Sequence, residues 1–156
     1  MRESQVLTDN VIVTMASAYA AGKPEWTAWS GHNLITNVAR NQLASFLTGA
    51  AITAPNWIGL GTGTASATSV SASGLQFEVN RQSAVTRELY NSYSARYVAT
   101  FGTTEGNGVL RELGLFTHSG IGTGKLWAIA DISATKTTAN TMSVTWFLAI
   151  LTGSAL

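Results

Sequence analysis

The sequence has no cysteine, and only two prolines and two histidines among its 156 residues. Without cysteine the chain has no disulfide, thiolate metal site, iron–sulfur cluster or thiol nucleophile. A chain of this length can bury enough apolar surface to fold without such cross-links. We therefore expect one domain with an arm, stabilised by an ordinary hydrophobic core.

Charge is also scarce, because only 11% of the residues are charged and the formal net charge is +1. The basic residues are dispersed and several adjoin an acid, as in Arg87/Glu88 and Arg111/Glu112. Nucleic-acid binding normally requires a dense cationic stripe, so no nucleic-acid partner is expected. About a quarter of the residues are charged in a typical soluble domain. So little charge predicts that other copies or a partner cover much of the surface.

Long hydrophobic runs are missing as well. The most apolar run, residues 146–151, is far shorter than the roughly 20 residues that a membrane-spanning helix needs. The apolar run at residues 11–13 is too short for the core of a secretory signal. We expect no membrane partner and a chain that stays in the cytoplasm where it is made.

One helix is predicted at about residues 36–47. Apolar residues recur there at helical spacing and polar residues occupy the other face. Asn33 or Thr36 can cap its start, because a short polar side chain accepts a hydrogen bond from a free backbone N–H. Gly49 can end the helix in the left-handed conformation.

The rest of the chain reads as strands and turns. Residues 1–10 form a polar arm, residues 11–15 alternate like a strand, and the segment with Trp26 and Trp29 shows no clear period. Residues 61–74 are almost entirely small or polar and predict a surface loop. Further strands are predicted at residues 57–60, 75–80, 83–90, 96–102, 109–116, 125–132 and 142–151.

About seven or eight short strands with glycine-rich turns predict a mainly β fold, an antiparallel β-sandwich or a jelly-roll-like barrel. One short α-helix and an N-terminal arm complete it. Residues 1–30 would form the arm and first strand and contact a partner. Residues 31–156 would form a single β-sandwich domain.

Two glycine-rich segments suggest phosphate binding. Gly59, Gly61 and Gly63 follow a predicted strand, but the next glycine of a dinucleotide motif is missing and no helix follows. Residues 120–125 resemble half of a Walker motif, but Leu126 replaces the hydroxyl residue that would hold magnesium. We interpret both as turns and expect no cofactor.

Groups suited to catalysis are few. His32 and His118 have no second ligand at metal-binding spacing, so no metal site is predicted. Glu78 and Glu112 could form a glycosidase pair. Arg81 lies three residues from Glu78, and Arg111 adjoins Glu112. A buried carboxylate needs a partner, so structural ion pairing is favoured and no enzyme activity is expected.

Five tryptophans stand out in so small a chain. Trp127 and Trp146 lie in patterned strands and are predicted in the core. Trp26 and Trp29 could anchor a protein interface, where tryptophan is enriched, or stack on sugars. We favour the protein interface.

Several short motifs occur in a characteristic order over roughly residues 32–150. They are Asn33-Leu34-Ile35-Thr36-Asn37, Trp57-Ile58-Gly59-Leu60-Gly61-Thr62-Gly63-Thr64, Leu75-x-x-Glu78-x-x-Arg81, Glu105-Gly106-Asn107-Gly108, Glu112-Leu113-Gly114-Leu115-Phe116, then Lys136 and Val144-Thr145-Trp146. This order resembles that of small virion proteins of tailed bacteriophages.

The resemblance implies a β-rich, non-enzymatic component of a virion, assembled in the host cytoplasm as a trimer or other homo-oligomer. The small size and the arm favour a capsid decoration, or cement, protein that bridges major capsid subunits. The alternatives are a tail, baseplate or fibre-attachment subunit that binds tail proteins, and a carbohydrate-binding module. The motif residues that we expect to be structural are Asn33, Gly59, Gly61, Gly63, Glu78, Arg81, Glu112 and Gly114.

Overall fold

A computed structural model describes residues 10–19, 22, 24–64 and 69–149. Over these residues it contains ten strands and one helix, more strands than the seven or eight that we predicted. Nearly all of the predicted arm, residues 1–9, lies outside the described residues.

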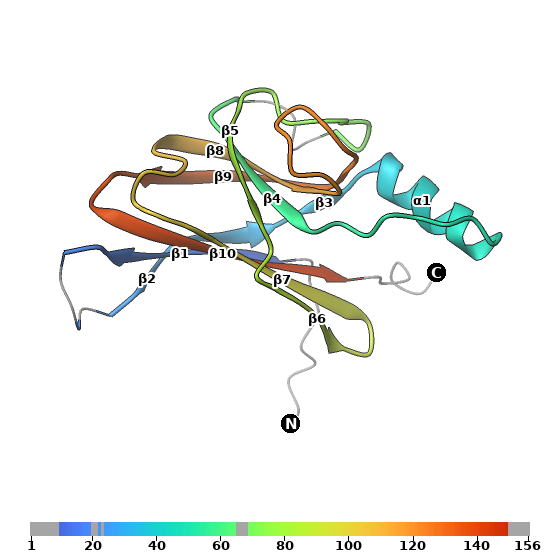
Figure 1. The fold of residues 1–156 in the computed structure, drawn as a ribbon, viewed down its shortest axis with the longest axis horizontal. Helices are drawn as coiled ribbons and strands as arrows, with labels where there is room; N and C mark the ends of the chain where they lie inside the picture. The colour runs from blue at the N-terminus through green and yellow to red at the C-terminus, as the bar shows by residue number, and fades with distance from the viewer. Residues whose placement is uncertain (1–9, 20–21, 23, 65–68, 150–156) are drawn as a thin grey trace.

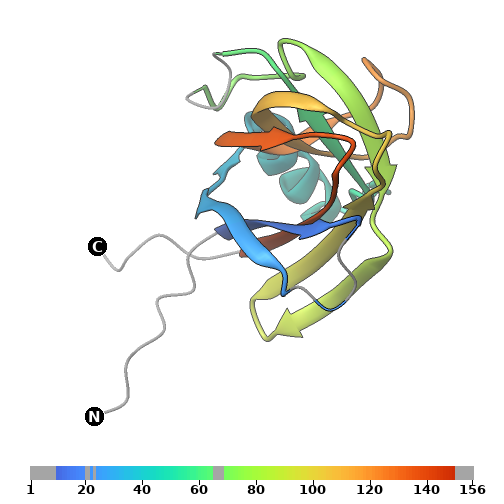
Figure 2. The same ribbon diagram turned by 90° about the vertical axis from the view of Figure 1, so that its left-hand side faces the viewer.

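The strands form two antiparallel sheets of five strands each, stacked as a sandwich (Figures 1 and 2). The first sheet has the order β2 (Trp26–His32), β1 (Asn10–Ser17), β10 (Asn140–Ala149), β7 (Ser94–Phe101) and β6 (Thr86–Asn91). The second has the order β3 (Leu34–Ile35), β9 (Leu126–Lys136), β8 (Gly108–Phe116), β4 (Trp57–Gly61) and β5 (Glu78–Ser83). The predicted mainly β fold is confirmed.

The core lies between the sheets and follows the two-residue alternation of each strand. In β7, Tyr97, Ala99 and Phe101 are buried on one face. In β10 every second residue is likewise buried, up to the end of the described strand: Met142, Val144, Trp146 and Leu148. Ile150, the next residue of this alternating set, lies outside the described residues.

The first strand belongs to this same core. β1 pairs with β10 from Val11, opposite Trp146, to Ser17, opposite Asn140. Val11, Val13 and Met15 are buried between the sheets. The segment assigned to an arm and first strand thus shares a sheet with the C-terminal strand.

The helix α1 (Asn37–Leu47) lies at one end of the sandwich (Figure 1) and packs against β9. Of the two predicted caps, Thr36 is the one used, because its Oγ1 accepts from the Ala39 N–H at 3.2 Å. The same hydroxyl donates to the Leu126 carbonyl at 2.6 Å and ties the helix to the sheet. Gly49 follows the helix with φ +91°, in the left-handed region that favours glycine.

Three predictions about strands were wrong. Trp26 and Trp29 lie in the regular strand β2, whose period is hidden by a bulge in its pairing with β1. The strand predicted at residues 75–80 begins three residues later, because residues 75–77 belong to no strand and β5 begins at Glu78. The predicted strand at 83–90 is two strands: Ser83 ends β5 in the second sheet and Thr86 begins β6 in the first.

Candidate functional site

The motif residues other than Asn33 meet on the outer face of the second sheet, which the chain itself covers. A second apolar cluster lies there, formed by Phe116, Leu126 and Ile129. Ala72 and Leu75 pack on it from the segment before β5. Residues 69–77 and the hairpin loop 117–125 therefore form a lid over this face, and the predicted surface loop is partly packed.

The motif glycines leave space for the groups under this lid. A Cβ on Gly59 would lie 2.6 Å from Glu78 Oε1, and one on Gly114 would lie 2.5 Å from the Phe116 ring. A Cβ on Gly63 would lie 1.9 Å from Glu112 Oε1. Carboxylates and a ring therefore fill the space beside these glycines, where a phosphate-binding loop would need room for an anion.

Glu78 and Arg81 form the ion pair that the sequence suggested. Arg81 Nε donates to Glu78 Oε1 at 2.5 Å and Nη2 donates to Oε2 at 2.7 Å, and both side chains are almost completely buried. The remaining nitrogen, Nη1, donates to the carbonyls of His118 (2.7 Å) and Thr123 (2.9 Å). The guanidinium also lies 3.6 Å from the centroid of the Phe116 ring. Arg81 thus holds the hairpin loop 117–125 against the sheet.

Glu112 holds the other half of the lid. Its side chain is buried and accepts the N–H groups of Gln76 (2.7 Å) and Phe77 (3.2 Å). Arg111, the neighbour suggested by sequence, is exposed. Every residue except proline has a backbone N–H, so the sequence does not indicate that Glu112 binds the backbone of Gln76 and Phe77.

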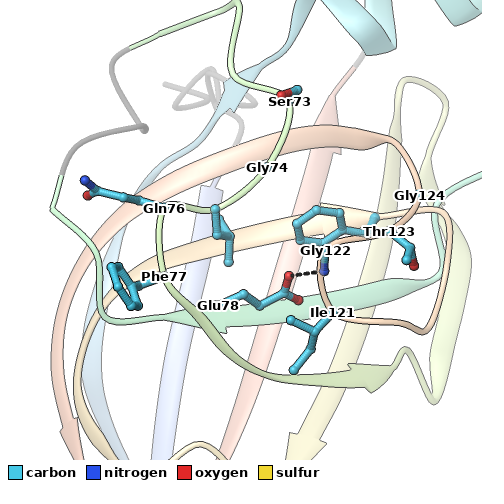
Figure 3. Close-up of a pocket in the computed structure, with 11 residues that line it drawn as sticks. Ser73, Gly74, Gln76, Phe77, Glu78, Ile121, Gly122, Thr123 and Gly124 are labelled. Atoms are coloured by element: carbon cyan, nitrogen blue, oxygen red, sulfur yellow. Dashed lines mark hydrogen bonds between the residues drawn. The ribbon is translucent and has the colours of Figure 1, made fainter.

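A cavity of about 310 Å3 lies between the two halves of the lid (Figure 3). Glu78 lies at its floor, where Oε2 also accepts the Gly122 N–H at 3.3 Å. The rim carries two exposed apolar side chains, Phe77 and Ile121. The carboxylate is already engaged by Arg81 and Gly122, which suits it to holding the loops rather than to acid–base chemistry.

The other candidate groups lie elsewhere. Asn33 Nδ2 donates to the Phe147 carbonyl at 3.2 Å and so links the start of β3 to β10. His32 is exposed at the end of β2, and His118 Nδ1 lies 3.2 Å from Thr117 Oγ1. Within the described residues, no three His, Asp or Glu side chains gather as metal ligands would.

The two tryptophans of β2 differ in exposure. Trp29 packs against the core, and its ring lies so close to Gly31 that a Cβ there would be 2.5 Å from it. Trp26 is 44% exposed. The pair therefore does not present two free rings side by side.

A bare apolar surface occurs at the β6 edge of the first sheet. Val85, Leu89 and Tyr93, before, in and after β6, are 69%, 77% and 64% exposed. We call these three residues the edge patch; the half-exposed Tyr90 lies on the other face of the sheet, where its ring is 4.8 Å from that of Phe147. Sequence reasoning missed the patch, because strand periodicity does not reveal which strand ends a sheet.

An apolar groove of about 350 Å3 adjoins the edge patch. Leu89 and Tyr93 form part of its wall, and Tyr97, Trp127 and Leu148 line it from the core side. Trp127 Nε1 is buried and has no hydrogen-bond partner among the described residues. The edge patch is therefore continuous with a hollow between the sheets.

Comparison with known proteins identified no relative: no family model, no curated protein and no solved structure matches this chain. Over its described residues, none of the helical structure is long and apolar enough to span a membrane.

Proposed function

We propose that this protein is a non-enzymatic structural component of a tailed-phage virion, in which copies associate with one another and bridge major capsid subunits as a decoration protein. The observation that carries the proposal is the edge patch, an apolar surface on an open sheet edge. The order of the sequence motifs supports the placement in a virion.

An open edge suits a building block for two reasons. The outer side of β6 has no neighbouring strand among the described residues, so its backbone N–H and C=O groups can pair with another chain. Side chains of the patch would add apolar area, at roughly 25 cal/mol per Å2 before the entropy of association is subtracted.

The motif residues support the same proposal from the opposite side of the sandwich. The hydrogen bonds of Arg81 and Glu112 join the sheet to the lid, and Glu78 pairs with Arg81 beneath it. A firmly held lid gives the second sheet a fixed outer shape, as a subunit that repeats in a shell requires.

The alternative of a sugar-binding platform has less support. Stacking on a sugar needs an open aromatic face, and Trp29 packs against the core while Trp26 is only partly exposed. A tail or baseplate role uses the same edge patch, so localisation must separate it from capsid decoration.

Immunogold labelling of purified particles tests the proposal. Label on the head supports a decoration protein, and label on the tail overturns that placement in favour of the tail alternative. Particles without label would contradict a virion role altogether. For a protein found on the head, particles that lack it should lose resistance to heat and osmotic shock, and equal resistance would refute bridging of capsid subunits.

A further inference from the structure

A lysine occupies a core position at the end of β9. Ile132, Ala134 and Lys136 alternate with exposed residues and all point inward, and Lys136 is only 1% exposed. Its Nζ donates to the Gly102 carbonyl at 2.6 Å and to Asn107 Oδ1 at 2.9 Å. A buried amine therefore lies against the side-chain amide of an asparagine.

The turn before β8 fixes that amide in one orientation. Asn107 Nδ2 donates to the Thr103 carbonyl at 2.8 Å, so the amide nitrogen points away from the lysine and the carbonyl points toward it. Gly106 has φ +62°, and a Cβ there would lie 2.3 Å from Leu60 Cδ1. Only glycine allows the turn to pack this closely, so the position of Asn107 is built into the fold.

A carboxylate, that of Glu105, lies near enough to Lys136 to influence its charge, but it forms no ion pair with it. Glu105 Oε2 accepts the Gly102 N–H at 2.7 Å, and Gly102 is the residue whose carbonyl receives Lys136. Burial lowers the pKa of Lys136 from its ordinary value of 10.5, while the charge of Glu105 acts in the opposite direction. Burial thus increases the fraction of the neutral amine, which is the nucleophilic form.

We propose that Lys136 and Asn107 join in an intramolecular isopeptide bond that the folded protein forms by itself. The Nζ lone pair attacks Asn107 Cγ, which lies at most about 4 Å away because the carbonyl bond adds only about 1.2 Å to the distance from Nζ to Oδ1. The Nζ–Cγ bond forms and the Cγ–Nδ2 bond breaks. For the proton transfer, the Glu105 carboxylate must leave the Gly102 N–H and turn toward Nζ; it then takes the proton that Nζ loses and passes it to Nδ2, which leaves as ammonia.

The reaction needs no oxidant, metal or other co-reactant. One amine and one primary amide become one secondary amide and one ammonia, and Glu105 ends in the state in which it began. The bond would lock the start of β8 to the end of β9, at the point where Gly108 pairs with Lys136. A chain without cysteine would thereby gain a covalent cross-link that reduction does not break. The inference is independent of the proposed function.

Intact-mass spectrometry of the purified full-length protein tests the proposal. The protein should be lighter than its sequence mass by one ammonia, and a tryptic digest should contain a branched peptide that joins the segments around Asn107 and Lys136. Lys136→Met, Asn107→Ala and Glu105→Gln should restore or largely restore the sequence mass. Lys125→Met, the matched control at an exposed lysine, should keep the loss of ammonia.

Two results would overturn the proposal. One is a wild-type protein that keeps its full sequence mass after prolonged incubation at neutral and mildly alkaline pH. The other is an ammonia loss that persists in Lys136→Met and is cleaved by hydroxylamine, because Asn107-Gly108 would then have formed a succinimide. If Lys136→Met fails to fold, the wild-type digest and Glu105→Gln, which keeps both reacting groups, still decide the question.

Discussion

Individual buried charges hold the surface loops of this protein in place. Arg81, Glu78 and Glu112 lie under the lid. Arg81, which pairs with Glu78, binds the loop that follows β8, and Glu112 binds the segment that precedes β5. A buried charge destabilises the folded state unless hydrogen bonds or an opposite charge compensate it. Removal of one member of a buried pair therefore leaves the other charge uncompensated and lowers the stability of the protein. The lid should therefore depend on a few single residues.

Arg81→Met should destabilise the protein by about 3–5 kcal/mol, because it leaves Glu78 buried without its cation. The matched control is Arg96→Met, which breaks the far more exposed pair with Glu88 and should cost about 1 kcal/mol or less. Urea unfolding followed by tryptophan fluorescence measures both. Equal losses in the two variants would show that burial of the Glu78–Arg81 pair is unimportant.

Gly63→Ala should cost about 1–3 kcal/mol, because the new methyl group would collide with Glu112 Oε1 and Gln76 Cβ. Gly74→Ala is the control from the same lid, since a Cβ there meets nothing within 4 Å. That control should be neutral or slightly stabilising. Urea midpoints of the two variants decide, and a Gly63→Ala protein as stable as wild type would contradict the packing described for Glu112.

Stability at alkaline pH should depend on Tyr97. Burial raises the pKa of its phenol above 10.0, against the opposing charge of Arg87, so the folded protein binds more protons than the unfolded chain above pH 10. The contribution is complete below pH 10 and is lost as the pH rises through the raised pKa. Urea unfolding between pH 8 and 11 should show a smaller loss of stability for Tyr97→Phe than for wild type, and parallel curves would refute the shift.

Elements whose signals are local could be predicted from the sequence. The helix is found almost at its predicted ends, because its cap Thr36, its apolar face and Gly49 lie within one short stretch. β7 and β10 follow from two-residue alternation, since one face of each is fully buried.

Elements that depend on distant partners could not be predicted. Residues 75–77 alternate like a strand, but Glu112 takes the amides of Gln76 and Phe77, so no strand pairs there. β2 was missed because a bulge against β1 breaks its period. The same limit applies to the site: the Glu78–Arg81 pair is close in sequence, whereas the lid and the edge patch arise from the sheet order.

Thr36→Val should destabilise the helix and its attachment to β9. The change removes the acceptor for the Ala39 N–H and the donor to the Leu126 carbonyl, and loss of a helix cap alone costs about 1–2 kcal/mol. Thr48→Val, at the exposed end of the helix, should change stability by only about 0.5 kcal/mol. Thermal unfolding by circular dichroism compares them, and similar melting temperatures would contradict the role given to Thr36.

The two sheets of the sandwich differ in how much of their surface the rest of the chain covers. The second sheet is packed on the core by one face and covered by the lid on the other. The first sheet ends at β6, where the edge patch adjoins an open groove. This asymmetry, together with the low charge of the chain, is the physical basis of the association with other polypeptides that we propose.

Sedimentation equilibrium of the purified protein tests that claim most directly. We predict a concentration-dependent mass that rises to a multiple of 16.4 kDa, and a single-chain mass for Leu89→Lys with an unchanged circular dichroism spectrum. Val109→Lys, at an exposed apolar residue of the second sheet, should associate like wild type. A wild-type mass of 16.4 kDa at every concentration would contradict self-association through the edge patch.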